Sequence, residues 1–301
     1  MTGFARTVLG DVEADRLGTV LAHEHLIIDS PIVAGSLPHI HLPSVDDAIT
    51  ESKLMMKAGV GTVVDAMPAG SGGHFGRLAE VSRQVGLHVV ATTGMHTARY
   101  YEPGDRHLSA SAEELAHTFI RAITGPSPRA GVIKVATLGL DPSEQERRLF
   151  EAAAMAVAAT GAPVLTHCED GVGAVAQIEL LSRLGIQLSR VCLSHTDKVA
   201  DRGYHRALLD AGALLCLDQG LRQSEQTAAL VVDLVADGYG NRLLIGTDAA
   251  RRTLWSSLGG PRGPGWMNGE FRALLANRGL EDGQIVGLFV DNPARWLTIS
   301  G

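Results

Sequence analysis

The sequence predicts an α/β fold, a single (β/α)₈ TIM barrel, from three observations. Short apolar runs alternate with helical stretches along the whole chain of 301 residues. Eight such runs are present, and runs that are apolar throughout indicate parallel strands covered on both faces. Eight strand–helix units in a chain of about 300 residues suit a closed barrel better than an open sheet. No G-x-G-x-x-G follows the first run, which argues against a dinucleotide-binding sheet.

The expected elements follow one another in a regular order. Residues 6–18 are expected to form a short N-terminal hairpin before the barrel. The expected strands are 19–26, 61–67, 87–94, 131–137, 162–169, 190–197, 213–220 and 242–249. Capping residues and terminal glycines predict helices over 43–59, 142–161, 170–185 and 224–238. The tail 281–297 is expected to be a final helix that ends at Asn292-Pro293.

The chain shows no sign of division into separate domains. No low-complexity linker interrupts it, so we expect one domain over residues 1–301. The Gly/Pro-rich segment 258–269 follows the last strand and is too irregular for a helix or a strand. Since long irregular segments in compact domains are often functional, we expect this one to be an active-site loop.

Composition excludes several classes of partner. The chain has a net charge of −7 and no basic stripe, which argues against nucleic acid as a partner. Its apolar runs are far shorter than a membrane span, and its first residues lack the apolar core of a signal peptide. Cys168, Cys192 and Cys216 lie in apolar runs without CxxC spacing, as reduced core thiols do. We therefore expect a cytoplasmic protein that acts on a small molecule and binds neither nucleic acid nor membrane.

Residues capable of binding a metal recur where the expected strands end. His23 and His25 end the first strand, and they point to the same side because they are two residues apart. Lys134 interrupts the apolar fourth strand, and the fifth, sixth and eighth strands end with His167, His195 and Asp248. Active sites of such barrels lie at the carboxyl ends of the strands, so these side chains are expected to converge. Their chemistry predicts a metal site.

A second His-x-His pair shows that this spacing alone is weak evidence. His39 and His41 lie in a loop between Pro38 and Pro43. We expect at most a place at the rim of the pocket for them. A lone histidine at a strand end is more often a hydrogen-bonded structural residue than a ligand, so the metal prediction depends on the six strand-end residues together.

Five segments together resemble the phosphotriesterase family of the amidohydrolase superfamily. They are "GTVLAHEHL", "GVIKVAT", "PVLTHCE", "VCLSHTD" and "LLIGTDAA", and the resemblance extends over residues 6–298. It implies that two divalent metal ions bind and that a carbamate, formed on Lys134 from carbon dioxide, bridges them. By this resemblance one metal ion is held by His23, His25 and Asp248, and the other by His167 and His195.

Elementary chemistry agrees with this implication. Burial lowers the pKa of a lysine because its ammonium loses hydration, and a neutral amine reacts with carbon dioxide to give an anionic ligand. The alternative for Lys134 is a snorkelling or ion-paired lysine. Two metal ions would activate a bridging hydroxide, and Asp248 would be the catalytic residue that takes its proton and passes it to the leaving oxygen. We expect zinc, with manganese, cobalt or iron as alternatives.

The residues after the last strands resemble the family branch that hydrolyses sugar lactones, some of them phosphorylated. Arg222 and Arg251 match positions where basic side chains of that branch hold an anionic group, and an arginine fork suits phosphate or carboxylate. Tyr100 and Tyr101, after the third strand, are further candidates to contact the substrate. The alternative for each arginine is a solvated or ion-paired loop residue.

The chain departs from the organophosphate-hydrolysing members at two positions. Gln219 stands where those have a histidine, and Lys198 stands where they have an acid. Aromatic residues make up only 4% of the chain, which leaves little to line a pocket for aryl groups. We therefore expect a binuclear lactonase that opens a small, polar, anionic sugar lactone. The alternatives are a phosphotriesterase or general esterase and, from another class, a barrel that binds a ligand without turnover. The resemblance also implies a homodimer.

Overall fold

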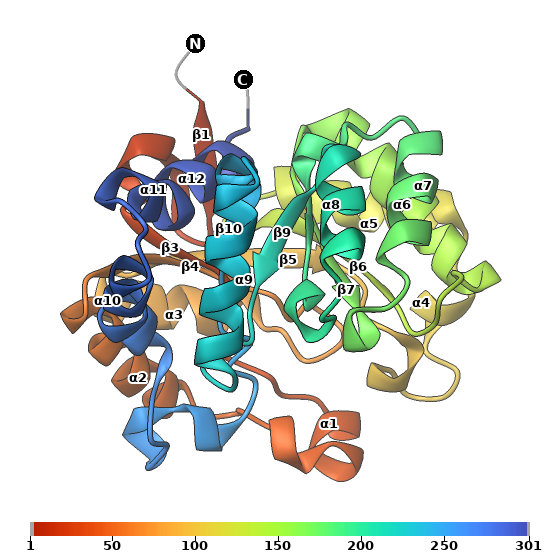
Figure 1. The fold of residues 1–301 in the computed structure, drawn as a ribbon. Helices are drawn as coiled ribbons and strands as arrows, with labels where there is room; N and C mark the ends of the chain where they lie inside the picture. The colour runs from red at the N-terminus through yellow and green to blue at the C-terminus, as the bar shows by residue number, and fades with distance from the viewer. Residues whose placement is uncertain (1–2, 300–301) are drawn as a thin grey trace.

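Eight parallel strands form a nearly closed barrel in the computed structural model, which describes residues 3–299 (Figure 1). Each strand pairs with the next one along the chain, and every expected strand is present, so the predicted barrel is confirmed. The single domain predicted over residues 1–301 stays a prediction, and its first two and last two residues lie outside those described. The strands are β3 (Thr19–Glu24), β4 (Val60–Asp65), β5 (His88–Gly94), β6 (Ala130–Thr137), β7 (Val164–Cys168), β8 (Val191–Leu193), β9 (Leu214–Leu217) and β10 (Leu243–Ile245).

The barrel closes where the chain after β10 meets β3. The backbone N–H groups of Thr247 and Asp248 donate to the carbonyl oxygen of His23, at 3.1 and 3.0 Å. Gly246 permits this approach, because a Cβ there would lie 2.9 Å from the backbone nitrogen of His23. The closure therefore brings the end of the last strand against the end of the first and places Asp248 beside His23.

Helices cover the outside of the barrel, and their ends follow local capping signals. Ser111 and Ser143 each begin a helix with a capping box, in which a glutamate three residues on returns a hydrogen bond. Gly161 ends a helix in left-handed backbone, which suits glycine. The helices before the C-terminal ones are α1 (Pro31–Ser36), α2 (Val45–Lys57), α3 (Phe75–Val85), α4 (Arg106–Ser109), α5 (Ala112–Thr124), α6 (Glu144–Thr160), α7 (Ala174–Arg183), α8 (Arg202–Asp210), α9 (Ser224–Ala236) and α10 (Glu270–Asn277).

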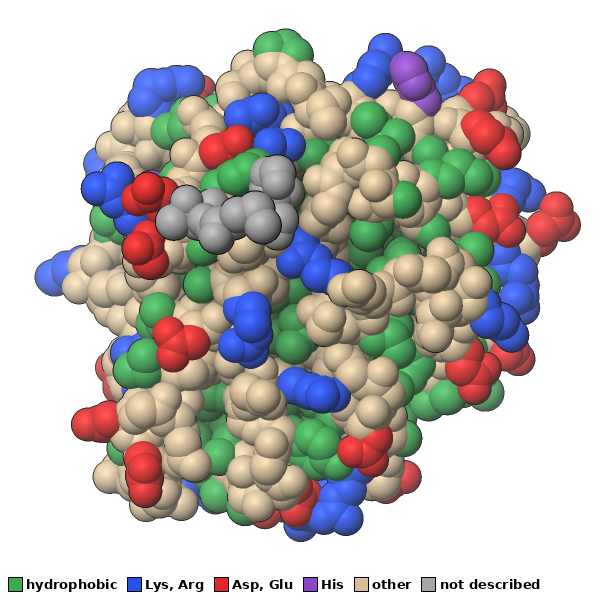
Figure 2. Space-filling model, turned by 90° about the horizontal axis from the view of Figure 1, so that it is seen from above, with side chains coloured by type: hydrophobic (Ala, Val, Ile, Leu, Met, Phe, Trp, Pro, Cys, Tyr) green, Lys and Arg blue, Asp and Glu red, His purple; other side chains and the backbone are tan. Residues whose placement is uncertain are grey.

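The predicted N-terminal hairpin lies at the amino-terminal end of the barrel. Its strands β1 (Phe4–Thr7) and β2 (Gly10–Glu13) pair antiparallel, and the N–H of Val8 donates to the carbonyl oxygen of Val89 at 2.9 Å. Figure 2 looks onto this side of the molecule, where both termini lie, and charged side chains of both signs are scattered over it. The hairpin therefore covers the end of the barrel away from the carboxyl ends of the strands.

The C-terminal helix is present but does not end where the sequence predicts. Helix α11 (Asp282–Val286) continues through a π-helical turn (Gly287–Asp291) into α12 (Asn292–Leu297). Proline is tolerated in the first turn of a helix, where its missing N–H would have no partner. Pro293 occupies that position in α12, directly after the wider π turn. The prediction that the helix ends at Asn292-Pro293 is therefore wrong.

The Gly/Pro-rich segment 258–269 is a packed connection. It contains a 3₁₀ turn (Pro264–Asn268), and Asn268 Nδ2 donates to the carbonyl oxygen of Ala58, just after α2, at 2.7 Å. Gly265 lies so close that a Cβ would meet the Cβ of Ala58 at 3.1 Å. No residue of this segment lines the cavity described below. The expectation of an active-site loop here is therefore wrong, because the segment packs against the end of α2.

Apolar side chains fill the barrel and the layer outside it. One cluster lies inside the barrel and a larger one lies between the strands and the helices. Cys168, Cys192 and Cys216 are buried free thiols, and burial raises the pKa of Cys168 to about 12. Within residues 3–299, no helix is long and apolar enough to cross a membrane. The packed interior leaves the polar strand ends as the floor of a cavity.

Candidate active site

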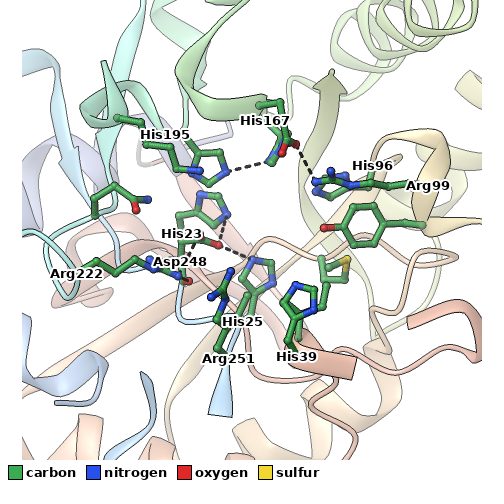
Figure 3. A pocket seen from close by; sticks show the side chains of 17 residues that line it. His23, His25, His39, His96, Arg99, His167, His195, Arg222, Asp248 and Arg251 are labelled. Carbon is green, nitrogen blue, oxygen red and sulfur yellow. Dashed lines mark hydrogen bonds and ion pairs between the residues drawn. The ribbon is translucent and has the colours of Figure 1, made fainter. Parts of the chain in front are cut away.

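A cavity of about 320 Å³ opens at the carboxyl ends of the strands (Figure 3). Lys134, in β6, is only 1% exposed and does not line it. The other five predicted ligands do: His23, His25, His167, His195 and Asp248. The structure therefore brings these five side chains together, and their roles as ligands stay a proposal.

His23, His25 and Asp248 form a cluster whose ligand atoms all lie within 4.8 Å of one another. Asp248 Oδ1 is 3.3 Å from His25 Nε2 and 3.8 Å from His23 Nε2. Burial opposes ionisation of Asp248, but the hydrogen bond from His25 holds its pKa below the ordinary value. Burial lowers the pKa of His23 to about 3, so this imidazole is neutral, which is the form that binds metals. One carboxylate and two imidazoles are a donor set that suits zinc.

The backbone is strained at two of the predicted ligands. His195 has a φ of 63° and Asp248 a φ of 47°, in the left-handed region that residues other than glycine seldom adopt. Such outliers cost about 1–3 kcal/mol each and cluster at functional sites. Both residues lie shortly after the end of a strand, β8 and β10 respectively. The fold thus maintains strain at the point where the predicted ligands face the cavity.

His167 and His195 point a ring nitrogen at each other. His167 Nδ1 and His195 Nε2 are 2.9 Å apart. The outer nitrogen of each ring faces a carboxylate: His167 Nε2 lies 2.8 Å from Glu169 Oε2, and His195 Nδ1 lies 3.0 Å from Asp218 Oδ1. Because an ionised carboxylate only accepts, the ring protons belong on the outer nitrogens. Two lone pairs then face each other across the gap, and such an arrangement fits a cation.

Asp218 orients two of the predicted ligands at once. Its side chain is fully buried, and besides His195 Nδ1 it lies 3.1 Å from His23 Nδ1. It also accepts the backbone N–H of His195 at 3.0 Å and Gln219 Nε2 at 2.7 Å. Burial opposes its ionisation, but His195 holds the pKa of Asp218 well below the ordinary value. Because carboxylates that accept from metal-binding histidines fix the ring tautomer, Asp218 is a candidate positioning residue that sequence reasoning did not assign. Its position at the end of β9 is the sequence feature that could have identified it.

Lys134 has the environment that the chemistry of carboxylation requires. Its side chain lies on the same face of β6 as Val132, which belongs to the buried apolar cluster inside the barrel. Burial lowers the pKa of Lys134 to about 8, so about a tenth of the amine is neutral at pH 7. Within residues 3–299, its ammonium forms no ion pair, which argues against the ion-paired alternative.

The segment after β5 contributes a cavity residue, His96, that sequence reasoning missed. His96 lines the cavity, and its Nδ1 accepts the backbone N–H of Thr97 at 2.8 Å. Burial lowers the pKa of His96 well below the ordinary value, so its single ring proton lies on Nε2. His96 is therefore a hydrogen-bond donor in this arrangement and not a metal ligand. Its place just after a strand end is the signal that could have identified it.

The second His-x-His pair divides between the cavity and the surrounding loop. His39 lines the cavity, as expected for a residue at the rim. His41 instead bonds Asp29 Oδ1 through Nε2 at 2.8 Å, and the same carboxylate accepts from Arg77 at 2.7 Å. This pair is therefore no second metal site.

The two predicted substrate tyrosines face different ways. Tyr100 lines the cavity, whereas Tyr101 does not. The hydroxyl of Tyr101 accepts the backbone N–H of His96 at 3.1 Å, and its side chain is buried. The 3₁₀ turn Ala98–Tyr100 separates the directions of these adjacent side chains. In this structure Tyr101 therefore supports the cavity wall from behind, and its role in substrate binding stays a prediction.

Arg222 and Arg251 both line the cavity but differ in their partners (Figure 3). Arg222 donates to the carbonyl oxygens of Thr247 and Asp248, at 2.9 and 2.6 Å, and its guanidinium lies 3.5 Å from Asp248 Oδ2. The exposed Arg251 forms no ion pair with any residue in the described range 3–299. Arg222 is thus occupied with the loop after β10, while the charge of Arg251 is available to a ligand.

Fold and site together define a class of protein. A (β/α)₈ barrel with a cluster of histidine and aspartate side chains at the carboxyl ends of its strands is the architecture of a barrel hydrolase that uses metal ions. The chain belongs to the phosphotriesterase family, whose model matches residues 4–297. The predictions of this family and of a hydrolase that acts on ester bonds are confirmed.

Its relatives agree in fold and differ in the substrates that their names state. The chain is 27% identical to a phospho-furanose lactonase of Mycoplasmopsis synoviae, over 98% of this chain and 91% of that protein. It is also 27% identical to an aryldialkylphosphatase of Saccharolobus solfataricus, over 82% of this chain and 81% of that protein. The crystal structure of a lactonase from Listeria monocytogenes shares the fold, with a TM-score of 0.92, 23% identity and coverage of 99% and 100% of the two chains.

Proposed function

We propose that this protein is a binuclear metal-dependent lactonase. His23, His25 and Asp248 would hold one divalent metal ion, His167 and His195 the other, and a carboxylated Lys134 would bridge them. The observation on which this rests is the pair of ring nitrogens, His167 Nδ1 and His195 Nε2, which face each other at 2.9 Å with a carboxylate at the outer nitrogen of each ring. When bound, the metal ions would polarise the substrate carbonyl and make a nucleophile of water near neutral pH. Zinc is the metal we expect, with manganese, cobalt or iron as alternatives.

Asp248 is the residue that we propose to move the proton. Its carboxylate reaches the cavity and contacts both His25 and Arg222, at 3.3 and 3.5 Å. It is ionised, because its pKa lies below the ordinary value, and so it can accept a proton from the attacking water. The protonated carboxyl would then donate to the oxygen that leaves when the lactone ring opens.

An anionic sugar-type lactone is the substrate that the cavity favours. Arg251 offers a guanidinium with no carboxylate partner among residues 3–299, and its fork suits a phosphate or carboxylate. Tyr100 and His96 add hydrogen-bonding groups that suit ring hydroxyls. The name of the phospho-furanose lactonase relative supports the same class. The aryldialkylphosphatase relative supports a phosphotriesterase as the second candidate.

Metal analysis of the purified protein tests the core of this proposal. We expect about two metal ions per chain, and fewer in Lys134→Ala, whereas Lys53→Ala on the exposed face of α2 should match the unchanged protein. Parallel rate measurements should then show faster turnover of sugar lactones than of aryl phosphotriesters. A protein that binds no metal ions, or one that turns over neither class, would refute the proposal. The homodimer and the cytoplasmic location stay predictions.

A further inference from the structure

One carboxylate outside the predicted ligand set contacts the predicted ligand His167 and lines the cavity as well. Glu169 begins the 3₁₀ turn (Glu169–Gly171) that follows β7 directly. Its Oε2 lies 2.8 Å from His167 Nε2 and also 2.8 Å from Arg99 Nη2. Arg99 comes from the turn after β5, so this carboxylate joins two separate loops at the edge of the site.

We infer that Glu169 is a positioning residue of the metal centre, which keeps the proton of His167 on Nε2 and leaves Nδ1 free for a metal ion, while Arg99 holds the carboxylate in place. The inference rests on the proposed function, because it concerns one of the two proposed metal ions. It adds a residue that the strand-end pattern does not include.

The arrangement of atoms around His167 supports this role. Its Nε2 faces Glu169 Oε2 at 2.8 Å, and its Nδ1 faces His195 Nε2 at 2.9 Å. A neutral imidazole has one ring N–H, and a carboxylate oxygen accepts hydrogen bonds, so Glu169 favours the tautomer with the proton on Nε2. The lone pair of Nδ1 then points at His195 Nε2, 2.9 Å away. Within residues 3–299, the other hydrogen-bond contact of the His167 ring is the one with His195, so removal of the Glu169 side chain would leave the ring held from one side.

The ion pair between Arg99 and Glu169 contributes little to the stability of the fold. Their side chains are 43% and 27% exposed. Ion pairs with this exposure contribute only about 0–1 kcal/mol, because water and salt screen them. Holding one oxygen of Glu169 at His167 is a geometric task that such a pair can perform at low cost. Arg99 also lies over the ring of Tyr100, with 5.3 Å from its guanidinium carbon to the ring centroid, which fixes its own position.

Glu169 and Asp218 contact different numbers of the proposed ligands. Asp218 is fully buried and serves both His195 and His23. Glu169 serves His167 alone and is reached from the cavity. Loss of Glu169 should therefore weaken the binding of the metal ion held by His167 and His195 and leave the binding of the other metal ion unchanged.

Metal titration of the full-length protein tests the inference. The metal-free protein and its Glu169→Ala, Glu169→Gln and Arg99→Ala variants would be titrated with Zn²⁺ against a competing chelator. Removal of a carboxylate behind a metal-binding histidine lowers metal affinity about 10- to 100-fold, so Glu169→Ala should show one unchanged site and one weakened to that extent. Glu169→Gln keeps an oxygen that accepts from Nε2 and should fall between the unchanged protein and Glu169→Ala, as should Arg99→Ala. The exposed Glu179 of α7 provides the control, and Glu179→Ala should bind both ions normally.

Two further readouts separate positioning from general damage. The melting temperature of metal-free Glu169→Ala should equal that of the metal-free unchanged protein, and cobalt loaded into the protein should show an altered visible spectrum in this variant. If the unchanged protein binds two ions and Glu169→Ala binds both with the same affinity, the inference is wrong and the proposed function survives. If the unchanged protein binds no ions at all, both fail.

Discussion

Arg251→Ala should reduce the activity of this protein only toward substrates with an anionic group. Arg251 lines the cavity and has no ion pair within residues 3–299, so its guanidinium is the cation most available to a ligand. A hydrogen bond to a charged group is worth about 1.5–3 kcal/mol, and exposure to water favours the lower value. Since about 1.4 kcal/mol is a factor of ten in a rate or binding constant, we expect kcat/KM for a phosphorylated lactone to fall about tenfold.

The loss should come through KM, because the anionic group keeps the same contact in the ground state and the transition state. Initial rates would be measured with a matched pair of lactones, one with a terminal phosphate and one without. The uncharged lactone should be turned over equally by both proteins. High salt should reduce the difference between the two proteins, since it screens an exposed contact.

The neighbouring arginine provides the matched control. Arg252 is 53% exposed, pairs with Asp47 at 3.3 Å, and does not line the cavity. Arg252→Ala should therefore leave both rates unchanged. Equal losses on both lactones in Arg251→Ala, or no loss on either, would show that Arg251 does not hold an anionic group.

Four further outcomes follow from the same structure. Arg222→Ala should lower kcat for charged and uncharged lactones alike, and it should lower the melting temperature, because the loop after β10 loses two hydrogen bonds. An effect only on KM, and only for the charged lactone, would contradict this prediction. His96→Phe should raise KM for hydroxylated lactones and keep both metal ions, and loss of an ion by metal analysis would make His96 a ligand after all. Burial alone would raise the pKa of Asp29, but hydrogen bonds from its neighbours bring this pKa below the ordinary value. The ionised carboxylate therefore stabilises the fold at neutral pH, and this stabilisation is lost as the pH falls through the lowered pKa. Arg77→Ala should move acid unfolding to higher pH, which circular dichroism would follow. Added bicarbonate should raise the Zn²⁺ affinity of the metal-free protein in calorimetry but not that of Lys134→Ala.

The sequence was sufficient to predict the barrel and the cluster at its mouth because both depend on local signals. A strand shows itself in a short apolar run, and the residue that ends it is visible directly. The barrel topology then brings those ends together without any knowledge of side-chain contacts. Asp248 illustrates this, because closure of β10 on β3 places it beside His23 although the two residues are far apart in the chain.

Predictions about loops were less successful, because loop side chains are placed by tertiary contacts that no local pattern contains. Tyr100 and Tyr101 are adjacent and of the same type, yet only one of them faces the cavity. Arg222 lies where the sequence predicts an anion-binding residue, but backbone carbonyl oxygens of the neighbouring loop after β10 occupy its donors. Glu169 follows a predicted ligand by two residues, but only its distance to His167 Nε2 reveals its connection to the site.

The charges of the site explain why the proposed carbamate and the proposed metal ions should depend on each other. Asp218 and Asp248 both have pKa values below the ordinary one, and the imidazole of His23, with a pKa of about 3, supplies no compensating charge. The Lys134 ammonium, whose pKa is about 8, is a cation beside these two anions. Carboxylation replaces that cation with a third anion, which is costly in a buried site unless other cations enter. Two divalent ions supply the missing charge, so each event makes the other favourable and neither should proceed far alone.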